Sequence, residues 1–128
     1  MEKSNPRILI VEDNPDILEL YTIMLRHNNY HVLGKDSGEE IEPVIKNFLP
    51  DAIVLDMLLS GLDGLNVCKQ IKDDPSISHI PVIMVSAHAS GLEKSVEAGA
   101  EFFIAKPFDM ATFLNTLSHA LNLRSENI

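Results

Sequence analysis

Five polar residues stand directly after short runs of apolar residues, and their side chains could do chemistry together. They are three acids, one hydroxyl and one amine: Glu12, Asp13, Asp56, Ser86 and Lys106. Carboxylates held close together repel one another, and a proton or a cation relieves that repulsion. Oxygen ligands suit a hard ion such as Mg²⁺, which usually takes one or two carboxylates with waters and a phosphate oxygen.

A carboxylate can also act as a nucleophile and form an aspartyl phosphate. A lysine and a hydroxyl could hold the remaining phosphoryl oxygens, since phosphoryl transfer depends mainly on positioning and charge neutralisation. For any single residue, the simpler explanation that a loop follows the apolar run is at least as good. Five residues of complementary chemistry favour a shared site.

The apolar runs predict five β-strands. They are Ile8–Val11, His31–Gly34, Ala52–Leu55, Pro81–Val85 and Phe102–Ala105. The first, third and fourth runs are continuous and rich in β-branched residues, as in strands buried on both faces of a parallel sheet. The second run is more polar and is expected at or near an edge of the sheet.

Segments with helical spacing separate these runs. The first and last helices have the clearest apolar faces, formed by Ile17, Leu20, Tyr21, Met24 and Leu25 and by Met110, Phe113, Leu114, Leu117 and Leu121. Asn14 is the predicted N-cap of the first helix, with Pro15 in its first turn, and Asp109 is the predicted N-cap of the last. The third helix is expected to end before Asp74–Pro75, and the fourth is expected to be short.

Two further helix starts are predicted from capping boxes, which pair a hydroxyl residue with a glutamate three positions later. Ser37 and Glu40 form one such pair, and Ser90 and Glu93 form the other.

Strands alternating with helices predict an α/β fold of the (βα)₅ type, a doubly wound parallel five-stranded sheet. The expected strand order is 2-1-3-4-5, as in flavodoxin-like folds. Such sheets bind ligands beyond the carboxyl ends of the strands, where the strand order reverses. That point lies between the first and third strands, which would place Asp13 beside Asp56.

Length, charge and cysteine content limit the number of domains, the possible partners and the compartment. The chain has 128 residues, about one domain, and 10 basic against 19 acidic residues give a net charge of −9. Such a surface disfavours direct binding of nucleic acid. A single cysteine, Cys68, fits a reducing compartment. Without a signal peptide or a membrane-spanning apolar run, we expect a cytoplasmic location and no membrane partner.

Four blocks of the sequence resemble the receiver domain of two-component response regulators. They are ILIVEDNPD, IVLDMLLSGLDG, IPVIMVSAH and AGAEFFIAKPF, and the resemblance covers nearly the whole chain, 1–128. It implies that Asp56 accepts a phosphoryl group and that Mg²⁺ is the cofactor. Asp13, Asp56 and the backbone carbonyl of Leu58 would bind the ion directly, and Glu12 would bind it through water.

The resemblance assigns roles to further residues. It implies that Ser86 binds the phosphoryl group, that Lys106 pairs with it, and that Phe103 is the aromatic switch residue. It also implies a cis peptide bond between Lys106 and Pro107. Leu58 and His88, two residues after Asp56 and Ser86, are expected to tune the lifetime of the phosphorylated state.

Two departures from the family pattern stand out. The common Met-Pro pair after the phosphorylated aspartate is here Leu59–Ser60, and the switch aromatic is Phe rather than Tyr. The second change removes the phenol hydroxyl from Phe103.

The implied function is a phosphorylation-controlled signalling switch and not a metabolic enzyme. A sensor histidine kinase or a phosphotransfer protein would donate the phosphoryl group. The face of the fourth helix, fifth strand and fifth helix would then bind a downstream protein or a second copy. The chain starts at Met1 and ends soon after the fifth helix. We therefore expect a receiver without an output domain, or alternatively a receiver excised from a larger regulator or hybrid histidine kinase.

Two other functional classes remain open from the sequence. A flavodoxin-like FMN-binding protein would need a phosphate-binding loop after the first strand, where this chain reads EDNPD. A phosphatase with an aspartyl intermediate usually has a second aspartate two residues after the nucleophile, and here that position is Leu58. FMN absorbance and turnover of a chromogenic phosphate ester would identify these classes.

Overall fold

The computed structural model describes residues 5–59 and 62–126. Within these residues, five parallel strands form one sheet in the order β2-β1-β3-β6-β7, which confirms the predicted order 2-1-3-4-5. The strands are β1 (Arg7–Val11), β2 (His31–Lys35), β3 (Ala52–Asp56), β6 (Val82–Ser86) and β7 (Phe102–Ala105). The sequence pattern does not indicate a further antiparallel pair, β4 (Leu58–Leu59) and β5 (Leu62–Asp63).

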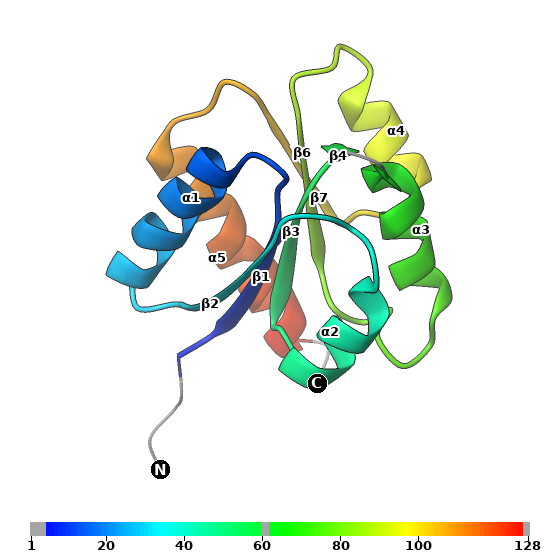
Figure 1. Cartoon of the computed structure of the whole chain (residues 1–128), viewed down its shortest axis with the longest axis horizontal. Coiled ribbons are helices and arrows are strands. Elements are labelled where there is room, and N and C mark those ends of the chain that lie inside the picture. Colours follow the sequence, from blue (N-terminus) through cyan, green and yellow to red (C-terminus); the bar gives the residue numbers. More distant parts are fainter. Residues whose placement is uncertain (1–4, 60–61, 127–128) are drawn as a thin grey trace.

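Five helices connect the strands in the described part of the chain. They are α1 (Pro15–His27), α2 (Ile41–Phe48), α3 (Gly64–Asp73), α4 (Gly91–Glu97) and α5 (Met110–Glu126). α2, α3 and α4 lie on one side of the sheet, and α1 and α5 lie on the other (Figure 1). The predicted doubly wound α/β fold is confirmed, as are the short fourth helix and the end of α3 before Asp74.

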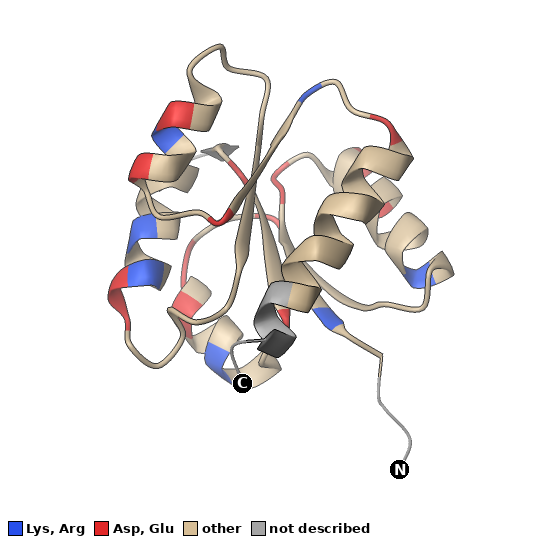
Figure 2. Cartoon of the chain, turned by 180° about the vertical axis from the view of Figure 1, so that it is seen from behind, with Lys and Arg blue, Asp and Glu red and all other residues tan. Residues whose placement is uncertain are grey.

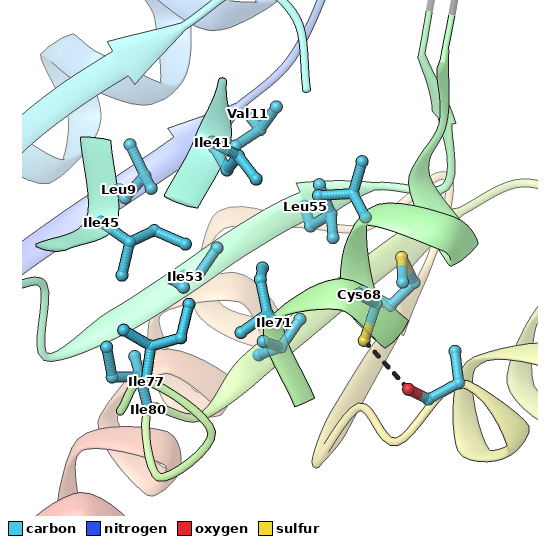
Figure 3. Packing of buried hydrophobic residues seen from close by; sticks show 14 of the residues in the cluster. Leu9, Val11, Ile41, Ile45, Ile53, Leu55, Cys68, Ile71, Ile77 and Ile80 are labelled. Carbon is cyan, nitrogen blue, oxygen red and sulfur yellow. Dashed lines mark hydrogen bonds between the residues drawn. The ribbon is translucent and has the colours of Figure 1, made fainter. Parts of the chain in front are cut away.

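Alternate residues of a strand point to opposite faces of the sheet, so the central strands contribute to two cores. In β1, Leu9 and Val11 belong to a buried cluster with residues of α2 and α3, part of which is drawn in Figure 3. Ile8 and Ile10 belong to a second cluster with residues of α1 and α5. In β2 only Val32 is buried, which agrees with the predicted edge position of this strand.

Two of the predicted helix caps are confirmed. The side-chain oxygen of Asn14 accepts hydrogen bonds from the backbone N–H groups of Asp16 and Ile17, at 3.0 and 3.2 Å. Asp109 accepts a hydrogen bond from the backbone N–H of Thr112 at 2.8 Å. These bonds satisfy backbone donors that the first turn of a helix leaves without a partner.

The two predicted capping boxes are wrong. α2 begins at Ile41, and its N-cap is Glu40, which has a φ of 53° and makes no side-chain capping bond. Ser37 therefore lies before the start of the helix. Ser90 is the N-cap of α4 but also makes no side-chain capping bond. Its hydroxyl lies instead 2.9 Å from Nδ1 of His88.

Leu20 and Met110 are exposed, although the sequence pattern places both on buried helix faces. Their exposed fractions are 62% and 55%. Only Tyr21 and Leu25 of α1 are buried, so the apolar stripe of this helix is wider than the surface that covers it. Leu20 and Met110 line a surface pocket of about 250 Å³ together with Met24 and other residues of α1.

A largely buried lysine joins three segments at the amino ends of β6 and β7. Lys72 Nζ donates hydrogen bonds to the carbonyl oxygens of Ser78 and Ile80, at 3.0 and 2.7 Å. It also forms an ion pair with Glu101 at 2.8 Å. The same oxygen of Glu101 accepts a hydrogen bond from the backbone N–H of Val82 at 2.8 Å. The network fixes the end of α3 to the starts of two strands.

Cys68 is buried in α3 and packs within the core, as its place on the apolar helix face predicts. Its Sγ donates a hydrogen bond to the carbonyl oxygen of Ala98 at 3.5 Å (Figure 3). Burial raises the pKa of the thiol to about 11. Among the described residues, no helix has the length and apolar character that a membrane span requires.

Candidate functional site

Three acidic side chains meet at the carboxyl ends of β1 and β3. Glu12 and Asp13 follow β1 directly, and Asp56 is the last residue of β3. The two strands are parallel neighbours with Val11 opposite Leu55, so the residues that follow come side by side. One carboxylate oxygen of each acid lies within 4.8 Å of the other two. The sequence prediction that Asp13 lies beside Asp56 is confirmed.

A lysine ammonium completes this cluster. Lys106 follows β7, and its Nζ donates a hydrogen bond to Oδ2 of Asp56 at 3.1 Å. The Lys106 and Asp56 side chains are 28% and 12% exposed, so solvent reaches the pair. The peptide bond between Lys106 and Pro107 is cis, as expected from the resemblance. The ammonium offsets part of the negative charge that the three acids bring together.

Glu12 is the most buried of the three acids, with an exposed fraction of 3%. Burial raises the pKa of its carboxyl group to about 8, and a hydrogen bond with Asp56 and the charge of Asp56 add to the increase. The charge of Lys106 acts in the opposite direction. Burial and Asp56 therefore favour the protonated form of Glu12 in the metal-free protein.

Ser86 lies at the end of β6 and is 3% exposed. Its hydroxyl oxygen accepts a hydrogen bond from the backbone N–H of His88 at 2.9 Å. The His88 side chain is exposed, and its Nδ1 accepts a hydrogen bond from the backbone N–H of Ser90 at 3.1 Å. Hydrogen bonds therefore connect Ser86, through His88, to Ser90, the N-cap of α4.

Phe103 lies in β7, is half-buried, and packs against the core on the side of α2 and α3. Its ring also lies against Gly91, the first residue of α4. A Cβ atom at Gly91 would come 2.9 Å from two ring carbons of Phe103 and 3.2 Å from Cβ of Ser86. The structure therefore brings the predicted switch residue next to Ser86. The role of Gly91 could not be predicted from the sequence, because it depends on how α4 packs against Phe103 of β7.

The segment after Asp56 is held by the start of α3. The backbone N–H of Gly64 donates a hydrogen bond to the carbonyl oxygen of Met57 at 2.9 Å. A Cβ atom at Gly64 would come 2.1 Å from the carbonyl oxygen of Asp56, so no larger residue fits there. Leu58 lies in β4, directly beyond Met57. The metal-binding role of its carbonyl stays a prediction, and its side chain, like Ser60, lies outside the described part.

The acidic cluster fits a divalent cation. Its three carboxylates are close enough to share one ion, and carboxylate oxygens are preferred by hard cations such as Mg²⁺. The same geometry suits attack by a carboxylate on a phosphoryl group, because an ammonium lies beside the Asp56 carboxylate.

Comparisons with known proteins give a consistent result. Residues 8–118 match the model of the response regulator receiver domain. The chain is 36% identical to the transcriptional regulatory protein BaeR of Escherichia coli over 84% of this chain and 45% of BaeR. It therefore spans less than half of that relative. It is 34% identical to the polar-differentiation response regulator DivK of Brucella ovis, over 89% of this chain and 94% of DivK.

A solved structure supports the same assignment. The receiver domain of a sensor histidine kinase from Pseudomonas aeruginosa is 28% identical, with a TM-score of 0.84. The alignment covers 92% of this chain and 98% of that one, whose active-site cleft coordinates a magnesium ion. The chain described here belongs to the response regulator receiver domains, the phosphorylation-controlled switches of two-component signalling.

Proposed function

We propose that Asp56 is the phosphoacceptor of this switch. The observation that carries the proposal is the convergence of three carboxylates with the Lys106 ammonium, which lies 3.1 Å from Asp56. Asp13, Asp56 and the carbonyl of Leu58 would hold Mg²⁺, and Glu12 would contact it through water. Mg²⁺ is supported by the oxygen donor set and by the magnesium ion in the related receiver domain.

The proposed reaction is an in-line transfer from a phosphohistidine. A carboxylate oxygen of Asp56 attacks phosphorus, the phosphorus–nitrogen bond breaks, and the donor imidazole leaves with the electron pair. Bound Mg²⁺ would supply positive charge to the phosphoryl oxygens. Lys106 and the Ser86 hydroxyl would donate hydrogen bonds to the same oxygens. Hydrolysis of the acyl phosphate by water would later restore the Asp56 carboxylate.

The donor in this proposal is a sensor histidine kinase or a phosphotransfer protein of the cytoplasm. The output is a protein contact through α4, β7 and α5, with a downstream partner or a second copy. Exposed apolar residues of α4 support this face, since Leu92 and Val96 are 57% and 64% exposed. The net charge of −9 argues against direct binding to nucleic acid. The chain would act as a signalling domain and not as a metabolic enzyme.

Phosphorylation by a small donor tests the proposal. The protein is incubated with Mg²⁺ and an acyl phosphate, and the adduct is mapped by mass spectrometry. We expect a single adduct on Asp56 that is absent in Asp56→Asn and after addition of EDTA. Asp51→Asn, in the loop before β3, is the control and should be labelled like the wild type. A stable adduct in Asp56→Asn, or labelling that EDTA does not affect, would contradict the proposal.

A further inference from the structure

The imidazole of His88 accepts hydrogen bonds at one defined nitrogen. The backbone N–H of Ser90 donates to Nδ1 of His88 at 3.1 Å, and the hydroxyl of Ser90 lies 2.9 Å from the same nitrogen. A backbone N–H can only donate, so Nδ1 carries no hydrogen and the neutral ring holds its proton on Nε2. The side chain of His88 thus closes a short ring of hydrogen bonds at the start of α4.

The backbone of His88 is held as well. Its N–H donates a hydrogen bond to the hydroxyl oxygen of Ser86 at 2.9 Å, and its carbonyl accepts one from the N–H of Gly91 at 3.0 Å. Residue 88 is therefore fixed to the end of β6 and to the start of α4 at the same time. Gly91 in turn contacts the ring of Phe103, so the arrangement reaches from Ser86 to the predicted switch residue.

We propose that His88 is a positioning residue that holds Ser86 in the unphosphorylated arrangement. The proposal rests on the proposed roles of Asp56 and Ser86 and adds a specific contact that opposes the switch. While the ring of His88 is bound to Ser90, the His88 N–H cannot follow the Ser86 side chain. Turning the Ser86 hydroxyl towards a phosphoryl group on Asp56 then breaks the bond with His88.

The expected size of the effect follows from the one hydrogen bond that is lost. A net contribution typical of such a bond corresponds to roughly a fivefold change in an equilibrium or rate constant. Without the His88 ring, only the hydrogen bond from the Gly91 N–H ties residue 88 to α4. Residue 88 can then follow Ser86 more easily, and its hydrogen bond with Ser86 is kept. Removing the ring should therefore ease formation of the phosphorylated arrangement by about fivefold.

The first test uses the unphosphorylated wild type and does not depend on any reaction at Asp56. Long-range proton–nitrogen correlation spectra of the histidine side chains identify which nitrogen of each ring is protonated. We expect His88 to be the Nε2–H tautomer at a pH where the ring is neutral. A His88 ring with its proton on Nδ1, or one that exchanges between both tautomers like a free imidazole, would overturn the proposal.

The second test separates the hydrogen-bond acceptor from the imidazole itself. His88→Ala removes the acceptor, whereas His88→Asn supplies a side-chain oxygen that can accept from the Ser90 N–H two residues on. The rate of Asp56 phosphorylation by an acyl phosphate is measured at saturating Mg²⁺. We expect an increase of about fivefold in His88→Ala and a rate within twofold of the wild type in His88→Asn.

The control is His119→Ala, which removes an exposed imidazole from α5 and should leave the rate unchanged. Equal rates in His88→Ala and His88→Asn, whether raised, lowered or unchanged, would overturn the proposal, because the acceptor would then not matter. A raised rate in His119→Ala would overturn it too, since the effect would not be specific to residue 88. If no protein is labelled at Asp56, the proposed function fails. The tautomer measurement then still shows whether Nδ1 of His88 accepts the hydrogen bond from Ser90.

Discussion

At the scale of single residues, the raised pKa of Glu12 makes the stability of the metal-free protein depend on pH. The group normally ionises near pH 4.5, but burial and Asp56 raise its pKa to about 8 in the folded, metal-free protein. Between these values the folded state binds more protons than the unfolded chain. The free energy of unfolding should therefore fall as pH rises through this window.

We predict that Glu12→Gln removes most of that decrease, because glutamine is neutral at every pH in the window. The measurement is the free energy of urea unfolding of the metal-free protein at several values between pH 5 and 8. Glu19→Gln, on the exposed surface of α1, is the control and should keep the wild-type slope. If Glu12→Gln and wild type show the same dependence on pH, Glu12 does not carry the proton.

Asp13 contributes to the same repulsion and, as proposed, binds the metal. Asp13→Asn should raise the metal-free stability by about 1 kcal/mol, because it removes one charge from the acidic cluster. It should also abolish the stabilisation by Mg²⁺. Thermal unfolding with and without Mg²⁺ measures both effects. Asp16→Asn, in the exposed first turn of α1, should keep the stabilisation by Mg²⁺. Lower metal-free stability in Asp13→Asn would argue against a shared pocket.

The acids and Lys106 could be predicted from the sequence because each follows a strand, and parallel strands deliver their carboxyl ends to one edge. Two contacts could not be predicted from the sequence: that of His88 with Ser90 and that of Gly91 with Phe103. The first depends on which way a histidine ring turns within a loop. The second depends on how α4 packs against β7, and the spacing of apolar residues does not specify that contact.

At the scale of helices and strands, sequence periodicity is reliable where both sides of an element are buried. β1, β3 and β6 were predictable for this reason. The capping boxes failed because a capping pattern does not fix the backbone conformation, and Glu40 adopts a positive φ at the start of α2. The β4–β5 pair could not be predicted either, since two-residue strands are too short to show a hydrophobic periodicity in the sequence.

Lys72 connects α3 to the segments that precede β6 and β7. We predict that Lys72→Met lowers the free energy of unfolding by about 2 kcal/mol, because two carbonyls and the Glu101 carboxylate lose their partner. Phosphorylation of Asp56 should be unchanged, since the network lies at the amino ends of the strands. Lys69→Met, on the exposed face of the same helix, is the control and should change stability little. Equal stabilities of the two variants would contradict this prediction.

At the scale of the whole molecule, charge is distributed unevenly over the proposed output face. α4 carries Glu93, Lys94 and Glu97, whereas α5 has no Lys, Arg, Asp or Glu from Met110 to Asn122 (Figure 2). A partner on this face would therefore meet apolar and neutral polar groups along α5. Contacts along α5 should therefore depend only weakly on salt.

A charged residue on α4 tests this face. Leu92→Asp should still be phosphorylated at Asp56 but should lose most of the phosphorylation-dependent self-association, because an acidic side chain would be desolvated in the contact. Sedimentation velocity of the phosphorylated proteins measures this. Ile23→Asp, at a similarly exposed apolar residue of α1, should associate like the wild type. If the phosphorylated wild type self-associates and Leu92→Asp associates equally, α4 is excluded from the interface between copies.

The alternation of buried side chains in β1 restricts how the chain can change over evolutionary time. Neighbouring residues of this strand belong to different cores, and the same strand delivers Glu12 and Asp13 to the site. A one-residue insertion or deletion within β1 would exchange the two faces and displace both acids at once. A change of length near the exposed Asn28, after α1, would leave the cores and the acids in place. Related sequences should therefore vary in length at such turns. A change of length within β1 should abolish both folding and signalling.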